Sequence, residues 1–182
     1  MSNSSKLERL WSPWRMEYVG SDKKSEQEEE YDFLEGAEED CFLCQYSAAS
    51  GDCGKMVVRR TDEILVCLNR HPYNNGHLLV APRHHLARLD EIPHRTLVEM
   101  TGAIVEYTNK LEKLIKAQGF NVGLNLGAAA GAGVPGHLHW HIVPRWQGDI
   151  NFTTTIAGTR VIPQSLEALW EILVATSTGS DF

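Results

Sequence analysis

A single long helical pattern between two groups of short strand patterns constrains the fold of this chain more than any other feature. Pro93 suits the first turn of that helix, and Gly119 suits the residue just past its end. A doubly wound parallel sheet needs a helical crossover between successive strands, so one such helix disfavours that architecture. The helix is predicted over residues 93–118, where these apolar residues recur at near-helical spacing: Leu97, Met100, Ile104, Leu111, Leu114 and Ile115.

The segments around this helix have the composition and turn residues of short strands. Strand, strand, strand, helix, strand, strand predicts an α+β fold with a mainly antiparallel sheet. A further helix is expected near the end of the chain, with Trp170 packed in the core beside Leu166, Leu169 and Leu173. The predicted strands are residues 56–60, 64–69, 77–81, 120–126 and 137–144, and the second helix is 165–175.

Three alternating histidines, His137, His139 and His141, are the strongest chemical feature of the chain. Alternate side chains of a strand point to one face, so the three imidazoles are expected to lie together while the residues between them enter a core. With 8 histidines in 182 residues, random placement produces this pattern roughly 0.015 times per chain. Chance is therefore a poor explanation.

The segment before these histidines, residues 126–136, has almost no side-chain bulk. Backbone N–H groups in such a loop can approach and bind an anion. Imidazoles beside a phosphate-sized site favour phosphoryl or nucleotidyl transfer, because a neutral ring can attack phosphorus and a protonated ring can stabilise its oxygens. A structural metal site is the alternative interpretation of the same residues.

The acidic balance of the chain limits its partners. The formal net charge is −7, and residues 26–40 carry nine acidic side chains and no basic one. We expect this acidic linker to be solvated and without fixed structure, or to bind a regulatory partner. Nucleic-acid binding depends on basic surface and is not expected.

Hydropathy gives no sign of a membrane partner. No apolar run approaches the ~18–20 residues of a membrane span, and the first residues lack the apolar core of a signal peptide. The expected location is therefore the cytoplasm. Large apolar residues between Leu10 and Val19 are expected to dock on the domain or on a partner subunit.

Four cysteines are present, and a disulfide framework is not expected in a reducing compartment. The close pair Cys41 and Cys44 is half of a zinc site, a free thiol pair or a redox pair, since two thiolates from one turn supply half of a tetrahedral site. Cys53 and Cys67 are interpreted as a loop thiol and a core residue.

The segment from His137 to Val143 resembles the signature of the histidine triad family, His-φ-His-φ-His-φ-φ, in which φ is apolar. The resemblance extends over about residues 41–152, in particular 69–83, 119–127 and 144–152, and is closest to the diadenosine polyphosphate hydrolases and phosphorylases. The opening from Leu10 to Val19 is similar to the bacterial phosphorylases of that branch. The resemblance implies the histidine triad fold, a mainly antiparallel five-stranded sheet with one long helix and a C-terminal helix.

The same resemblance implies an enzyme that cleaves dinucleoside polyphosphates, most simply diadenosine tri- or tetraphosphate, by nucleotidyl transfer to a histidine. His139 would be the nucleophile, and His141 would contact the phosphate and help the leaving group. Phosphate rather than water as the acceptor is one alternative, and a phosphoramidate or adenylyl sulfate substrate is another. A non-catalytic nucleotide-binding or zinc-stabilised adaptor is the rival from a different class.

Substrate contacts carried over from the family fall on Asn69, His77, Asn125 and the loop glycines Gly131 and Gly133. Asn125 matches a position that contacts phosphate or sugar, while Asn69 and His77 match residues near the nucleoside. The chain departs from the family at Gly133 and the next residue, valine, where relatives often have a glutamine or serine on the phosphate. Backbone N–H groups would have to make that contact here.

The resemblance also implies a structural zinc ion and no organic cofactor. His84 is the rival for the third ligand, and His94 is a weaker one. A bend at Pro135-Gly136 would swing the ring of the first triad histidine away from the phosphate. The implied ligands are Cys41, Cys44, His85 and His137.

The organisation expected from these arguments has three parts. Residues 1–40 form an arm and acidic linker, 41–152 the catalytic domain, and 153–182 an extension with a helix. Family members are usually homodimers whose sheets join, so we expect a homodimer that binds a small nucleotide substrate.

Overall fold

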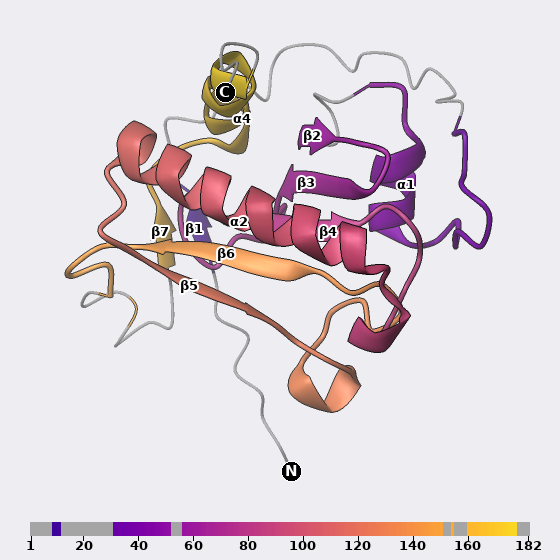
Figure 1. The fold of residues 1–182 in the computed structure, drawn as a ribbon. Helices are drawn as coiled ribbons and strands as arrows, with labels where there is room; N and C mark the ends of the chain where they lie inside the picture. Colours follow the sequence, from indigo (N-terminus) through magenta and orange to yellow (C-terminus); the bar gives the residue numbers. More distant parts are fainter. Residues whose placement is uncertain (1–8, 12–30, 52–55, 151–153, 155–159, 178–182) are drawn as a thin grey trace.

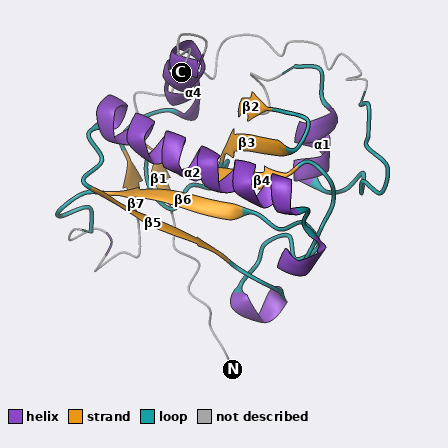
Figure 2. Cartoon of the chain, viewed as in Figure 1, coloured by secondary structure: helices purple, strands orange, loops and turns teal. Residues whose placement is uncertain are grey.

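The computed structural model describes residues 9–11, 31–51, 56–150, 154 and 160–177 (Figure 1). Figure 2 shows how its helices and strands alternate along the chain. In chain order the elements are β1 (Arg9–Trp11), α1 (Phe42–Ala48), β2 (Val57–Arg60), β3 (Ile64–Leu68), β4 (Leu78–Pro82), the 3₁₀ helix η2 (Leu89–Glu91), α2 (His94–Ile115), β5 (Gly119–Leu124), the 3₁₀ helix η3 (Ala128–Ala130), β6 (Trp140–Arg145), β7 (Arg160–Ile162) and α4 (Leu166–Ser177).

Five strands form one sheet in the order β2-β3-β4-β6-β5, and every neighbouring pair is antiparallel. The predicted α+β fold with a five-stranded antiparallel sheet is therefore confirmed. Strand β6 begins at Trp140 rather than at His137, because the chain before it is still turning. The N–H of His137 donates to the carbonyl of Val134 at 3.3 Å, and the N–H of Leu138 donates to Leu86 rather than to a neighbouring strand.

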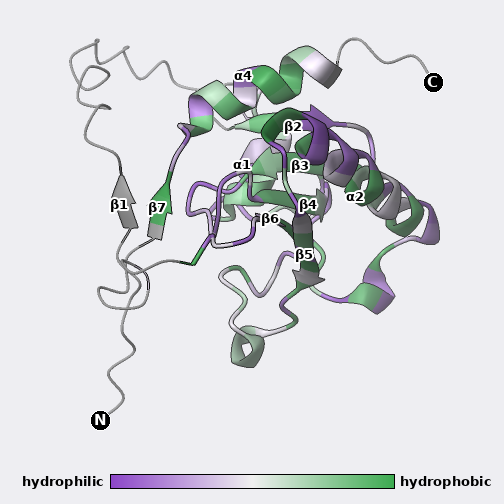
Figure 3. Ribbon diagram, turned by 90° about the vertical axis from the view of Figure 1, so that its left-hand side faces the viewer, coloured by the Kyte–Doolittle hydropathy of each residue, from purple (hydrophilic) through white to green (hydrophobic). Residues whose placement is uncertain are grey.

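Helix α2 lies across one face of the sheet and α4 lies beside β2 at its edge, and the main core is enclosed between these helices and the strands (Figure 1). Met100, Tyr107 and Leu111 of α2 are almost fully buried there, as are Leu169 and Leu173 of α4. Figure 3 shows hydrophobic residues concentrated in the strands that these helices cover. The predicted core position of the tryptophan in α4 is confirmed, since it packs against this cluster and its indole Nε1 donates to a β2 carbonyl at 2.6 Å.

Helix α1 packs on the opposite face, where Leu43 and Cys44 meet Leu65, Cys67 and Leu79. The sequence did not predict this helix, because it is only 7 residues long and no side chain caps its first turn. Apolar periodicity needs a longer window to be visible. Cys67 is fully buried, as predicted, whereas the predicted loop thiol at position 53 lies outside the described residues.

Helix α2 ends earlier than predicted. Its last turn is closed by Lys116 in the left-handed conformation, with φ of 55°, and Gly119 instead opens β5. The N–H of Gln118 donates to the carbonyl of Arg145 at 2.9 Å and so already belongs to the β5–β6 pairing. The prediction that Gly119 caps the helix is therefore wrong.

The second half of the acidic linker is attached to the domain. Tyr31 pairs with Ala49 in an isolated antiparallel bridge, and Phe33 and Ala37 pack against the cluster around α1. Its carboxylates are exposed as expected, but the prediction of a structureless linker is wrong for residues 31–40. Residues 26–30 lie outside the described part.

Strand β1, from the predicted apolar arm, pairs in parallel with β7, which brings a segment near the start of the chain beside one near its end (Figure 1). Most of the arm, including the residues from Trp14 to Val19, lies outside the described residues. Among the described helices, none has both the length and the apolar character that a membrane span requires.

Candidate active site and metal cluster

The central triad histidine, His139, is buried and oriented by the backbone. Its Nδ1 lies 2.8 Å from the carbonyl oxygen of His137. A carbonyl oxygen can only accept, so the neutral imidazole must have its proton on Nδ1 and its lone pair on Nε2. The free Nε2 lone pair is what an attacking imidazole needs.

The third triad histidine, His141, is oriented by a chain of hydrogen bonds. The backbone N–H of Tyr73 donates to Nδ1 of His77 at 3.0 Å, so a neutral His77 carries its proton on Nε2. That Nε2 lies 2.9 Å from Nδ1 of His141 and donates to it. The proton of His141 is therefore on Nε2, which is buried and has no hydrogen-bond partner among the described residues.

The two catalytic candidates thus present opposite chemistry. The rings of His139 and His141 lie edge to face with centroids 5.0 Å apart. Burial, and secondarily the nearby His139, lowers the pKa of His141 to about 4, so His141 stays neutral near pH 7. One ring offers a lone pair and the other an N–H donor, which is the combination required for attack on a phosphate whose oxygens need a donor.

Tyr73 was not singled out by the sequence patterns. In addition to its backbone contact, its ring stacks on His141 with centroids 5.6 Å apart and packs against His77 at 4.6 Å. Asn69, a predicted substrate contact, lies beside the imidazole of His77, with its Nδ2 3.3 Å from Nδ1 of that ring. The only sequence signal was the turn-rich stretch that contains Tyr73, which does not reveal a stacking partner.

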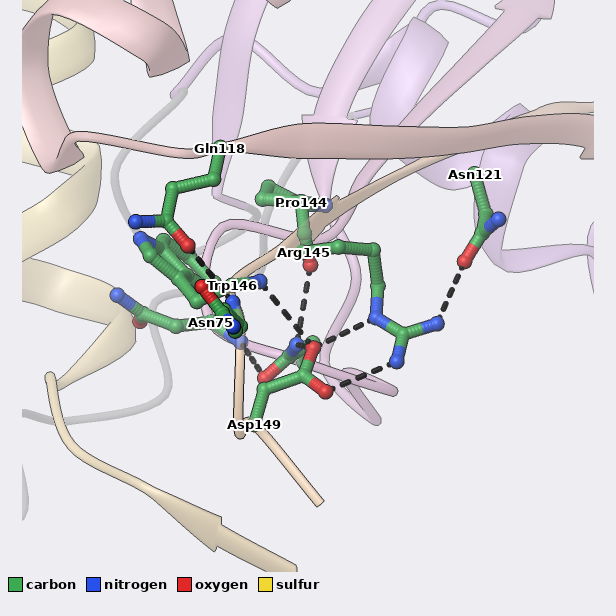
Figure 4. A network of polar contacts seen from close by, with 9 residues as sticks. Asn75, Gln118, Asn121, Pro144, Arg145, Trp146 and Asp149 are labelled. Atoms are coloured by element: carbon green, nitrogen blue, oxygen red, sulfur yellow. Dashed lines mark hydrogen bonds and ion pairs between the residues drawn. The ribbon is translucent and has the colours of Figure 1, made fainter.

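A polar network attaches the turn before His77 to the end of β6 (Figure 4). Arg145 holds both carboxylate oxygens of Asp149, at 2.6 and 2.8 Å, and also donates to Asn121. The amide of Asn74 donates to Asp149 at 2.9 Å and to the carbonyl of Pro144 at 3.0 Å. Residues far apart in the sequence therefore fix this turn, which is why its role could not be read from the sequence.

The turn also requires its glycine. Gly76 has φ of +75°, and a Cβ there would lie 2.8 Å from Ile115 of α2. The N–H of His77 closes the turn on the carbonyl of Asn74 at 3.3 Å. The conformation of this turn therefore positions His77 within hydrogen-bond distance of His141.

The predicted phosphate loop is exposed and open. Gly131 has φ of +83°, and a Cβ added at either Gly131 or Gly133 would meet no atom within 4 Å. Asn125 is half-buried at the start of this loop, directly after β5. A hollow of about 410 Å³ lies between the loop and residues 87–90, lined on the loop side by Leu126 and Pro135. This hollow lies beside the loop, and none of the three triad histidines lines it.

The remaining predicted site residues converge beside the end of the phosphate loop, next to Gly136. Cys41, Cys44, His85 and His137 each offer a ligand atom, and these atoms all lie within 4.8 Å of one another. Sγ of Cys44 lies 3.3 Å from Nδ1 of His85 and 3.5 Å from Nδ1 of His137, and Sγ of Cys41 lies 3.3 Å from that same Nδ1. The rival histidines at positions 84 and 94 are exposed and outside this cluster.

These distances fit a tetrahedral zinc ion. Zinc bonds of ~2.3 Å to sulfur and ~2.05 Å to nitrogen place the two ligand atoms about 3.6 Å apart. His137 donates through Nε2 to the carbonyl of Pro82 at 2.9 Å, which leaves the Nδ1 lone pair facing both sulfurs. Burial lowers the pKa of His137 to about 4, so the ring is neutral as a ligand must be. Burial also raises the pKa of the Cys44 thiol to about 11, a cost that a bound cation would remove.

His137 therefore makes two separate contacts, one through its ring and one through its backbone. Its ring belongs to the cysteine cluster, while its carbonyl orients His139. The expected bend is present as the turn from Val134 to His137, with Pro135 and Gly136 at its centre. The first triad histidine is thereby turned to the cluster, and the other two remain together.

Known proteins resemble this chain in sequence and in fold. Residues 51–148 match the family model described as the HIT domain. The "AP-4-A phosphorylase" of Mycobacterium tuberculosis is 37% identical over 165 residues, which cover 88% of this chain and 79% of that protein. The "Bis(5'-nucleosyl)-tetraphosphatase [asymmetrical]" of Schizosaccharomyces pombe is 32% identical over 98 residues, covering 54% of this chain and 53% of that protein.

Among solved structures, a zinc-bound histidine triad family protein from Mycobacterium smegmatis superposes with a TM-score of 0.56. It is 28% identical, and the match covers 68% of this chain and 84% of the other. The two chains therefore share a fold over most of their length.

Proposed function

The chain belongs to the histidine triad family, defined by the HIT domain, and on that premise we propose that it is an enzyme that cleaves dinucleoside polyphosphates by nucleotidyl transfer through His139. The observation that carries the proposal is the complementary pair of imidazoles. The carbonyl of His137 leaves a lone pair on Nε2 of His139, and His77 leaves a proton on Nε2 of His141.

The first step follows from these two atoms. Nε2 of His139 attacks the α-phosphorus of the substrate, a P–N bond forms, and the bond from phosphorus to the polyphosphate leaving group breaks. The ring becomes positively charged, and the carbonyl of His137 stabilises it through the Nδ1 proton. The Nε2 proton of His141 supports the charge on the phosphate oxygens. N–H groups of the loop around Gly131 and Gly133, with Asn125, would hold the remaining oxygens.

The second step requires an acceptor for the nucleotidyl group. We propose inorganic phosphate as the preferred acceptor, supported by the 37% identity to the mycobacterial "AP-4-A phosphorylase" over most of both chains. Water is the second candidate, supported by the shorter match to the Schizosaccharomyces pombe tetraphosphatase. Either acceptor breaks the P–N bond and returns His139 to its neutral form.

Product analysis separates the two acceptors. With diadenosine tetraphosphate, attack at the α-phosphorus releases ATP and leaves AMP on His139. Capture by phosphate gives ADP plus ATP, and capture by water gives AMP plus ATP. We expect ADP and ATP in equal amounts with phosphate present, read by ion-exchange chromatography. AMP as the sole second product at millimolar phosphate would refute phosphorolysis, and no turnover of any dinucleoside polyphosphate would refute the enzyme class.

For the cysteine cluster we propose a structural zinc ion bound by Cys41, Cys44, His85 and His137. The support is the fit of the ligand distances and the zinc in the mycobacterial histidine triad structure. Four protein ligands leave no open position, so the ion would hold the segment before α1 to the catalytic strand and would contribute folding free energy.

We also propose a homodimer joined along β5. One edge of the sheet, β2, is covered by α4, whereas β5 at the other edge is partly exposed, with Val122 41% exposed. An uncovered edge strand presents backbone groups that another strand can pair with. Light scattering should return about twice the chain mass at micromolar concentration. The proposed location is the cytoplasm, where nucleotides and reduced thiols coexist.

A further inference from the structure

One residue of the acidic linker, Glu38, contacts the cysteine and histidine cluster from outside. Its carboxylate oxygen Oε2 lies 3.4 Å from Nε2 of His85. Its carbonyl accepts the N–H of Cys41 at 3.0 Å, and its own N–H faces the sulfur of Cys44. Glu38 therefore reaches three of the four residues that form the cluster.

The carboxylate contact has a clear chemical direction. Nδ1 of His85 faces the sulfur of Cys44, so Nε2 is the remaining nitrogen, and it carries the proton when Nδ1 binds a metal. A carboxylate beside that proton fixes the tautomer and the orientation of the ring as a ligand. His137 has the equivalent partner in the carbonyl of Pro82. The two imidazoles thus have matched outer partners, one neutral and one charged.

We propose that Glu38 is a positioning residue for the metal, which orients His85 through its carboxylate and so raises the affinity of the cluster for zinc. This inference rests on the zinc proposal above. It also assigns a role to the acidic linker, whose acidic residues are exposed over residues 31–40. The last turn of this linker before α1 lies against the proposed metal site on its solvent side. The backbone contacts remain in any variant, so substitution of the side chain tests the carboxylate alone.

The expected loss of zinc affinity depends on how exposed the Glu38 side chain is. Loss of an outer partner of a metal ligand typically weakens metal affinity by about 10- to 100-fold. The side chain of Glu38 is 69% exposed, and water weakens such contacts. We therefore expect the low end, about tenfold.

The test measures zinc affinity of the full chain by competition with a chromophoric chelator. Glu38→Ala should bind zinc about tenfold more weakly than the wild type, and Glu38→Gln, which keeps an acceptor oxygen without the charge, should recover part of the loss. Glu39→Ala is the matched control, since it removes the same charge from the neighbouring exposed residue. It should stay within twofold of the wild type, and circular dichroism of the zinc-loaded proteins should be unchanged.

Three results would overturn the inference or its premise in distinguishable ways. Equal affinity of Glu38→Ala and the wild type would exclude the carboxylate as a positioning group. An equal loss in Glu39→Ala would reduce the effect to net charge. A wild type that takes up no zinc at all would remove the metal proposal itself, whatever the variants do.

Discussion

Substitution of Gly136 tests the proposed metal site without replacing any of the four proposed ligands. A Cβ built on Gly136 would lie 2.8 Å from Nε2 of His85. Restoring a normal separation of ~3.5 Å requires a shift of about 0.7 Å. Metal–ligand distances tolerate only about 0.2 Å, so Gly136→Ala should displace His85 as a ligand.

The effect should appear only in the zinc-bound protein. Without a metal, the His85 ring can turn away from the added Cβ. The φ angle of Gly136 lies outside the left-handed region, so alanine adds no backbone strain at this position. With zinc, the ring cannot move without losing the ion. A loss of at least ~10-fold in affinity corresponds to ~1.4 kcal/mol. For a chain of this size, that lowers the melting temperature by roughly 3–6 °C at saturating zinc.

The assay is thermal unfolding with saturating zinc and with excess chelator. Gly136→Ala should melt below the wild type with zinc and within about 1 °C of it or higher with chelator, because alanine restricts the unfolded chain. Gly133→Ala is the control for zinc binding, since its Cβ meets nothing within 4 Å. An equal loss with and without zinc, or an unchanged zinc affinity, would refute the reasoning.

Two further measurements address the catalytic pair. His139→Ala should lower kcat by at least ~10³ with substrate binding retained, and residual turnover above a tenth of wild type would exclude His139 as the nucleophile. The pKa of His141 is lowered to about 4, mainly by burial. The unfolded chain therefore takes up this proton first, and the free energy of unfolding should fall as pH drops from ~6.5 to ~4, by at most ~3 kcal/mol from this group. His141→Gln should flatten that decline in denaturant titrations, and an unchanged slope would contradict the assignment.

Much of the sheet was predictable because its strands are short apolar runs bounded by turn residues. Ile64–Leu68 is buried along its whole length, and such a run has few other places to go in a folded domain. Helix α1 was missed because seven residues carry too little periodicity. The end of α2 was missed because Lys116, rather than a glycine, takes the left-handed conformation, and its position is set by the pairing of β5 with β6.

The candidate site was predictable to the extent that it lies in one motif. His139 and His141 follow from alternation and from family resemblance. Tyr73, Glu38 and Asp149 do not. Tyr73 stacks on His141, Glu38 contacts His85, and Asp149 accepts from Asn74, and each contact spans dozens of residues that no local pattern encodes. The four residues of the cysteine and histidine cluster were expected only through the family resemblance, because Cys41 and His137 approach over 96 positions, a separation that no local pattern encodes.

The two contacts of His137 are made by different parts of the residue, and they can therefore change independently. Its contact with His139 is made by a backbone carbonyl, which every amino acid has, whereas its contact with the cysteines is made by the ring. Selection can therefore discard the metal cluster by replacing its four side chains with apolar residues of similar volume and still keep the carbonyl that orients His139. The ring of His137 can thus change while its carbonyl still orients His139, so the cysteine cluster and the orientation of the central imidazole are structurally separable.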